Sequence, residues 1–202
     1  AMSIISELYY RGILRRLSEY ELHGVFAVAN AKLQTKLAEI KANPDIYFAD
    51  FSSRRRLAFL WQEYCVSEAR QVLGPQFTGT SNTYLAARHD FVPIGTNAHE
   101  LTMVLTALAR HKSPEEMRYA QYHVLELWQE MYGEGLRIFL PDTYGSAQFF
   151  AGAPAWVTGW RGQRQDSGDP ITEGERYKTW LLSHGVDPKD KRTIFSDGLD
   201  VP

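Results

Sequence analysis

The sequence predicts an α/β fold in which short parallel strands alternate with helices. Two observations carry this expectation. First, six short apolar segments alternate with segments of helical periodicity along the 202 residues. Second, the apolar segments at 137–140, 156–164 and 193–195 stop abruptly at turns that contain aspartate. Apolar strands that end in polar turns are typical of active sites at the carboxyl edge of a parallel sheet.

The first elements in chain order are two helices with a strand between them. Residues 18–42 have the spacing of an amphipathic helix, which Pro44 ends. A strand is predicted at 46–49. The next helix ends at Gly74. Its apolar residues are Leu57, Leu60, Trp61, Tyr64, Ala69, Val72 and Leu73.

A second group of elements follows directly. Residues 77–82 are predicted to form a strand and a turn, and residues 84–88 a short helix. Another apolar strand is expected at 91–95, followed by a helix to Arg110.

The last third of the chain continues the alternation. A capping box with a proline opens a helix over 113–132. Strands are expected at 137–140, 156–164 and 193–195, with a helix at 172–184 before the last of them. Repeated units this compact favour a barrel over an open sheet.

A complete eight-stranded barrel takes ~250 residues, so we expect either that the (β/α) barrel is incomplete in this chain or that the sheet is open. Residues 1–45 would be a helical lead-in, and residues 46–202 a partial barrel domain that carries the active-site motifs.

Composition excludes several classes of protein. The net charge of −2 provides no field to hold a nucleic acid or an anionic membrane. Cys65 is the only cysteine, so a disulfide framework is excluded and a reducing cytoplasm is expected. No apolar run approaches the ~20 residues that cross a bilayer.

The predicted strand ends carry a set of polar residues that suits a polyanionic substrate with sugar hydroxyls. Arginine binds phosphate or carboxylate, carboxylates accept hydrogen bonds from vicinal hydroxyls or hold Mg²⁺, and histidine acts as base or nucleophile. The set is Arg54, Ser81, His99, Asp142, Arg164, Asp166, Asp197 and Asp200. Simpler readings exist: His99 is one of six histidines and could be structural, and the last two aspartates could form a turn. The residues by themselves indicate an enzyme with a parallel-sheet active site.

Five ordered motifs extend this interpretation. They lie at 79–82 (Gly-Thr-Ser-Asn), 95–100 (Gly-Thr-Asn-Ala-His-Glu), 142–145 (Asp-Thr-Tyr-Gly), 164–170 (Arg-Gln-Asp-Ser-Gly-Asp-Pro) and 195–200 (Phe-Ser-Asp-Gly-Leu-Asp). The set resembles the nicotinate phosphoribosyltransferases.

The resemblance implies an irregular α/β barrel with an additional domain, assembled as a homodimer with active sites near the subunit interface. It implies an enzyme of NAD salvage, which joins nicotinate to C1 of phosphoribosyl pyrophosphate. ATP hydrolysis would be coupled through a phosphohistidine, and Mg²⁺ would be bound through substrate phosphates.

The resemblance also implies roles for residues of the catalytic step. His99 corresponds to the histidine that ATP phosphorylates, and Asp142 would hydrogen-bond its imidazole. Asp166 and Asp197 would hold ribose hydroxyls or Mg²⁺-bound phosphates.

Substrate-binding roles follow in the same way. Arg164 would face the pyridine carboxylate, Phe51 would stack on the pyridine ring, and Arg54 would contact phosphate. Ser81 stands where the related nicotinamide-using enzyme has an aspartate, which would repel the carboxylate of nicotinate. The serine therefore favours the acid over the amide.

Two departures from the family pattern leave alternatives open. Ser52 replaces a glycine of the family motif Asp-Phe-Gly-x-Arg. The chain also resembles an internal fragment, about half of the enzyme, without the segments that would complete the pyridine and phosphate sites. The alternatives are a non-catalytic binding or assembly module that keeps the fold, and a phosphoribosyltransferase that acts on nicotinamide or quinolinate.

Overall fold

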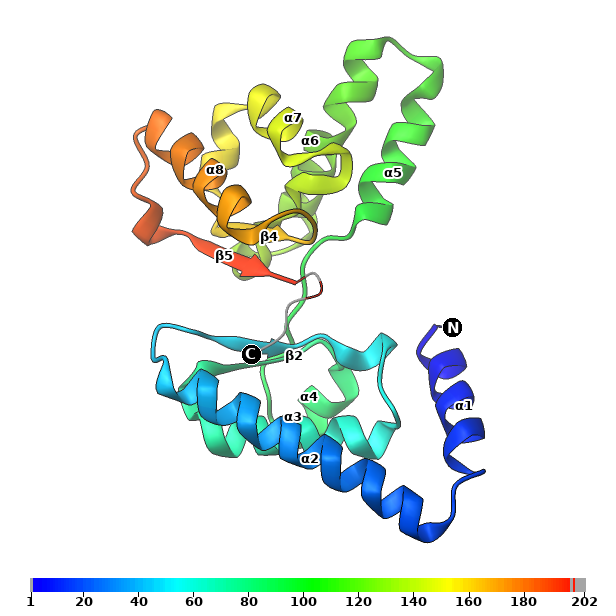
Figure 1. Cartoon of the computed structure of the whole chain (residues 1–202). Coiled ribbons are helices and arrows are strands. Elements are labelled where there is room, and N and C mark those ends of the chain that lie inside the picture. Colours follow the sequence, from blue (N-terminus) through cyan, green and yellow to red (C-terminus); the bar gives the residue numbers. More distant parts are fainter. Residues whose placement is uncertain (1, 197, 199–202) are drawn as a thin grey trace. The chain divides into compact units, whose positions relative to one another are not determined.

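The computed structural model describes residues 2–196 and 198, which divide into two compact units. The first unit extends to Ile94 and the second begins at Gly95. Each unit has a parallel sheet and a hydrophobic core of its own (Figure 1). The α/β class is thus confirmed. The described strands form two separate sheets, of two and three strands, and no complete barrel.

Among the described residues, the first unit contains the helices predicted at 18–42, before Gly74 and at 84–88, and a further helix at its start that was not predicted. They are α1 (Met2–Leu14), α2 (Glu19–Ala42), α3 (Phe59–Leu73) and α4 (Thr83–His89). Ser18 caps α2: its hydroxyl accepts from the backbone of Glu21, and the Glu21 side chain accepts from the backbone of Ser18. The helix predicted at 18–42 is confirmed.

The sheet of the first unit pairs β1 (Phe48–Asp50) with β2 (Phe77–Thr80) in parallel. Gly79 of β2 allows the segment around Val92 to approach the strand closely, because its φ is +136° and a Cβ there would lie 2.1 Å from the carbonyl oxygen of Val92. The strand predicted at 91–95 is not formed. Among the described residues a single bridge joins Pro93 to Thr80: the backbone N–H of Thr80 donates to the carbonyl of Val92 at 3.2 Å, and the N–H of Ile94 donates to the carbonyl of Thr80 at 3.0 Å. Pro93 itself has no N–H with which to pair a further strand on its other side.

The core of the first unit corrects the predicted face of α3. Leu60 is 73% exposed, and the residues of α3 that are buried are Gln62, Val66, Ala69 and Leu73. Their spacing of three to four residues is that of one helix face. Leu37, Ile40, Phe77 and Leu85 complete the cluster. The buried face therefore begins with a polar residue, which the apolar pattern did not predict.

The second unit contains four helices among the described residues: α5 (His99–Leu108), α6 (Pro114–Met131), α7 (Ser146–Gly152) and α8 (Pro170–Ser183). Ser113 and Glu116 form the predicted capping box of α6, with Pro114 as the first helical residue.

The sheet of the second unit has the order β3-β4-β5, all parallel, with β3 at Ile138–Phe139, β4 at Gly162–Gln165 and β5 at Arg192–Phe195. Gly162 allows the close pairing, since a Cβ there would lie 2.0 Å from the carbonyl oxygen of Arg192. The strand predicted at 156–164 is shorter than expected. Residues Ala155–Gly159 form a 3₁₀ turn, which packs Val157 into the core.

An aromatic core holds the second unit together. Phe139 of β3 is fully buried and contacts the rings of Phe149, Phe150, Trp160 and Tyr177. Such ring pairs stabilise by about 0.5–1.5 kcal/mol beyond the area they bury. This cluster fixes the helices against the sheet, and so fixes where the strand ends point.

No described helix is long and apolar enough to span a membrane.

A stability prediction follows from Gln163 on β4. Its side chain is 0% exposed, and neither its amide nitrogen nor its amide oxygen has a hydrogen-bond partner among the described residues. Because methionine has a similar shape and no unpaired polar group, Gln163→Met should raise the free energy of unfolding by about 1–3 kcal/mol. Urea unfolding followed by tryptophan fluorescence measures this difference.

The matched control is Gln165→Met, two residues along the same strand. Gln165 exchanges hydrogen bonds with the Ser146 hydroxyl and donates to the carbonyl of Ser167 at 2.8 Å. Its replacement should destabilise the protein. Equal effects of the two substitutions would contradict the analysis of Gln163.

Candidate active site

His99 is the first residue of α5. Its Nδ1 lies 2.9 Å from the hydroxyl oxygen of Thr143, and its Nε2 lies 3.3 Å from Oδ2 of Asp166. The side chain is 35% exposed, so a substrate can reach it. The amino end of a helix carries partial positive charge, which favours an anionic group at this position.

Arg164 and Asp166 form an ion pair beside this histidine, at the end of β4. Nη2 of Arg164 lies 2.6 Å from Oδ2 of Asp166. The guanidinium also donates to the hydroxyls of Thr96 and Ser196, each at 2.9 Å. These charge-assisted contacts hold the arginine in one orientation.

The surroundings of Asp166 determine its ionisation. Burial raises its pKa, but hydrogen bonds from Arg164 and Ser196 and the positive charge of Arg164 outweigh burial, so the pKa lies below its ordinary value. The carboxylate is therefore ionised at neutral pH. Its contribution to stability is fully present above the ordinary pKa of the unfolded chain and is lost as pH falls through the lower folded value.

Asp142 differs from the expectation that it hydrogen-bonds the imidazole. Its Oδ1 lies 4.0 Å from Nε2 of His99, which is too far for a hydrogen bond. Its Oδ2 instead accepts from the Ser167 hydroxyl at 2.6 Å and from the Asp166 backbone at 3.2 Å. The side chain is 2% exposed, and no residue in the described part of the chain hydrogen-bonds Oδ1. Asp142 thus ties the turn after β3 to the loop after β4.

The 3₁₀ turn Pro141–Tyr144 explains why the adjacent residues Asp142 and Thr143 contact different parts of the site. Asp142 turns into the protein, whereas the next residue, Thr143, contacts His99. Sequence reasoning did not single out Thr143 or Ser196, although both lie inside motifs that it had recognised.

In the first unit, the ends of β1 and β2 lie side by side. Asp50 is in register with Thr80, and the backbone N–H of Ser81 donates to the carbonyl of Asp50 at 2.8 Å. Phe51 and Ser81 therefore leave the same edge of the sheet. Phe51 is exposed. No described residue hydrogen-bonds the side chain of Ser81, so its hydroxyl can serve a ligand.

Arg54 lies in the 3₁₀ turn Ser52–Arg54, exposed, and its carbonyl accepts from the Ser6 hydroxyl of α1. Ser52 fits the family's glycine position without strain, because its φ is not positive. Its hydroxyl donates to Oδ1 of Asp50.

Among the predicted site residues, the second unit brings together His99, Asp142, Arg164 and Asp166, and the first unit contains Phe51, Arg54 and Ser81. Asp197 and Asp200 lie outside the described residues. The part of the chain that the structure describes contains no group of three or more histidine, cysteine or acidic residues placed to hold a metal ion.

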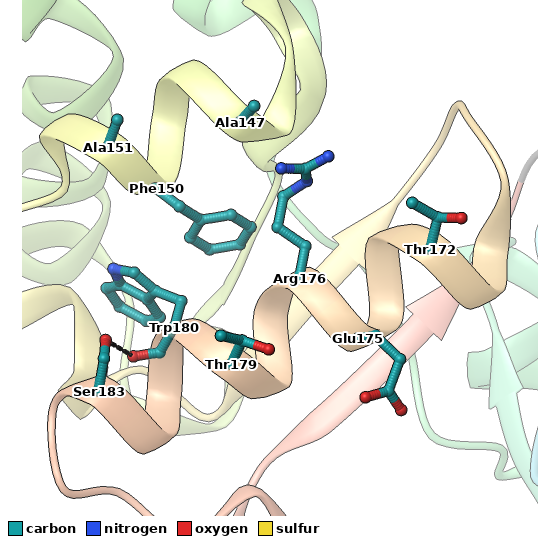
Figure 2. Close-up of a pocket in the computed structure, with 9 residues that line it drawn as sticks. All are labelled: Ala147, Phe150, Ala151, Thr172, Glu175, Arg176, Thr179, Trp180 and Ser183. Carbon is teal, nitrogen blue, oxygen red and sulfur yellow. Dashed lines mark hydrogen bonds between the residues drawn. The ribbon is translucent and has the colours of Figure 1, made fainter.

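A hollow of about 540 Å³ lies between α7 and α8 (Figure 2). Phe150 and Trp180 face it, with their ring centroids 5.2 Å apart, and Arg176 lies near its edge. None of the predicted site residues lines it. We therefore place the candidate site at the strand ends rather than in this hollow.

Comparison with known proteins agrees with the motifs. The profile of the Nicotinate phosphoribosyltransferase (NAPRTase) family matches residues 46–202. A crystal structure of nicotinate phosphoribosyltransferase from Porphyromonas gingivalis is similar, with 30% identity and a TM-score of 0.82 over 98% of this chain and 48% of that one. A structure from Vibrio cholerae has 30% identity and a TM-score of 0.85, over 98% of this chain and 46% of that one. The chain spans about half the length of these relatives, and it belongs to the nicotinate phosphoribosyltransferase family.

Proposed function

We propose that this chain contributes the ATP-dependent half-site of a nicotinate phosphoribosyltransferase, with His99 as the residue that accepts phosphate. The reaction would form nicotinate mononucleotide from nicotinate and phosphoribosyl pyrophosphate in NAD salvage. The observation that carries the proposal is the position of His99 at the start of α5, between Thr143 and the Arg164–Asp166 ion pair.

The contacts of His99 indicate which of its two ring nitrogens would act as the nucleophile. Asp166 is ionised and can only accept, so the ring proton belongs on Nε2, which faces it. The lone pair is then on Nδ1, where Thr143 donates. In the proposed step a bond forms from Nδ1 to the γ-phosphorus of ATP while the bond from that phosphorus to the oxygen of ADP breaks. The charge of Asp166 stabilises the imidazolium that results.

Mg²⁺ would be held through the phosphate oxygens of the substrates. Its chemistry would be to neutralise the departing phosphates. The barrel, the homodimer and the cytoplasmic location implied by the resemblance belong to the same proposal.

A second candidate function is a binding module that holds a pyridine carboxylate without catalysis. The observation that favours it is that Phe51 and Ser81 leave the same edge of the sheet of the first unit, so the contacts proposed for the pyridine ring and its carboxylate do not require the chemistry proposed for His99.

The first test uses the 202-residue chain with γ-labelled ATP and Mg²⁺. We expect acid-labile, alkali-stable phosphate on the wild-type chain, and only background labelling of His99→Ala. Addition of nicotinate and phosphoribosyl pyrophosphate should discharge the label.

The matched control is His111→Ala, because His111 is exposed and outside the site. It should label like the wild type. Label that persists in His99→Ala would refute the role of His99. A wild-type chain that binds nicotinate but takes up no phosphate would favour the binding module.

The second test concerns the choice between acid and amide. Ser81→Asp should weaken nicotinate binding by at least about tenfold, because a carboxylate near the ligand's carboxylate costs roughly 1–4 kcal/mol. The dissociation constant for nicotinamide should stay the same or fall. Titration calorimetry with both ligands gives the ratio of dissociation constants.

The control is Ser81→Asn, which has the shape of the aspartate without its charge. If Ser81→Asp and Ser81→Asn bind nicotinate equally, charge at this position does not select the substrate.

A further inference from the structure

A buried amide joins the two strand-end turns of the first unit. Gln62 of α3 is 1% exposed, and it is the polar residue that begins the buried face of that helix. Its amide has two donors and two acceptor positions. The structure gives a partner to each of them.

The nitrogen of the amide binds the turn after β1. Nε2 of Gln62 donates to Oδ2 of Asp50 at 2.7 Å and to the hydroxyl oxygen of Ser53 at 3.1 Å. Asp50 is itself buried, and it also accepts from Ser52 and from the Thr80 hydroxyl. The amide thus holds the segment that carries Phe51 and Arg54.

The oxygen of the amide reaches two other elements. Oε1 of Gln62 accepts from Nη1 of Arg56 at 2.8 Å and from Nδ2 of Asn82 at 3.0 Å. Arg56 is anchored to Glu7 of α1 at 2.8 Å. Asn82 follows Ser81 directly, and its Oδ1 caps α4 by accepting from the backbone of Leu85.

We infer that Gln62 is a positioning residue, which fixes the positions of Phe51 and Ser81 relative to each other. A flat aromatic carboxylate would then fit between the ring of Phe51, on which it stacks, and the hydroxyl of Ser81, which donates to it. The inference rests on the proposed function for the identity of the ligand. Gln62 itself acts through Asp50 and Asn82, and it does not contact the ligand.

The donor and acceptor pattern makes the inference specific to glutamine. In Gln62→Glu, a carboxylate oxygen replaces Nε2 and faces Oδ2 of Asp50. Both atoms are then acceptors, so the hydrogen bond that Gln62 donates to Asp50 is lost. The reciprocal change Asp50→Asn supplies a donor at that position. The double variant Asp50→Asn/Gln62→Glu therefore restores the hydrogen bond with its direction reversed.

The experiment measures nicotinate dissociation constants for the wild type, both single variants and the double variant of the 202-residue chain. Gln62→Glu should raise the dissociation constant at least tenfold. The double variant should return to within about threefold of the wild type. Gln71→Glu is the matched control, since it makes the same change at an exposed position of α3 and should leave binding unaltered.

Hydrogen exchange measured on the same four proteins gives a readout that needs no ligand. Gln62→Glu should speed exchange in both segments 50–56 and 80–85, and the double variant should restore protection in both. Loosening of only one segment would overturn the inference that a single amide couples them. A double variant that binds no better than Gln62→Glu would overturn it as well.

The two proposals fail in different ways. If the wild-type chain binds no nicotinate, the proposed function fails, and the exchange data alone decide whether Gln62 couples the turns. If the wild type binds and Gln62→Glu binds equally well, the proposed function stands and the positioning role is wrong.

Discussion

Both units depend on one constraint: two parallel strands bring their carboxyl ends to the same edge, where buried polar groups must find partners in one another. In each unit a buried aspartate meets that demand. Asp50 ends β1 and accepts from Ser52, two residues further along the chain, and from Thr80 of the neighbouring strand. Asp142 follows β3 and accepts from Asp166 and Ser167 beyond the neighbouring strand. The two aspartates thus have the same structural task, although only Asp142 was predicted to belong to the site.

This task explains why side chains with no catalytic chemistry lie so close to the candidate residues. A short parallel sheet fixes only the first residue after each strand, and the turns beyond it need further contacts. Gln62 supplies them in the first unit through Asp50 and Asn82. In the second unit, Ser196 and Thr96 hold Arg164, and Arg164 in turn holds Asp166. Fixed orientation of such groups is what electrostatic stabilisation of a transition state requires.

The sequence predicted much of this arrangement, and its failures have physical causes. The helix at 18–42, the capping box at Ser113 and the α/β class followed from local signals that act within a few residues. In place of the strand expected at 91–95, the described residues form one bridge to Thr80, and Pro93 has no N–H with which to pair a further strand on its other side. Gln62 was missed because apolar periodicity ignores a polar residue, whereas a glutamine at the spacing of Val66 and Ala69 is a signal of a buried network. The 4.0 Å separation of Asp142 from His99 depends on the turn at Pro141–Tyr144, which no local pattern specifies.

That separation has a consequence for the histidine. Oδ1 of Asp142 is buried without a hydrogen-bond partner, and an unpaired buried acceptor costs about 1–3 kcal/mol. Nε2 of His99 is the donor that could satisfy it, at the expense of about 1 Å of movement relative to an ordinary hydrogen bond. Two carboxylates, Asp142 and Asp166, therefore compete for one ring proton. In the proposed phosphoryl transfer to Nδ1 the imidazole gains a positive charge, which the negative charges of both carboxylates would stabilise.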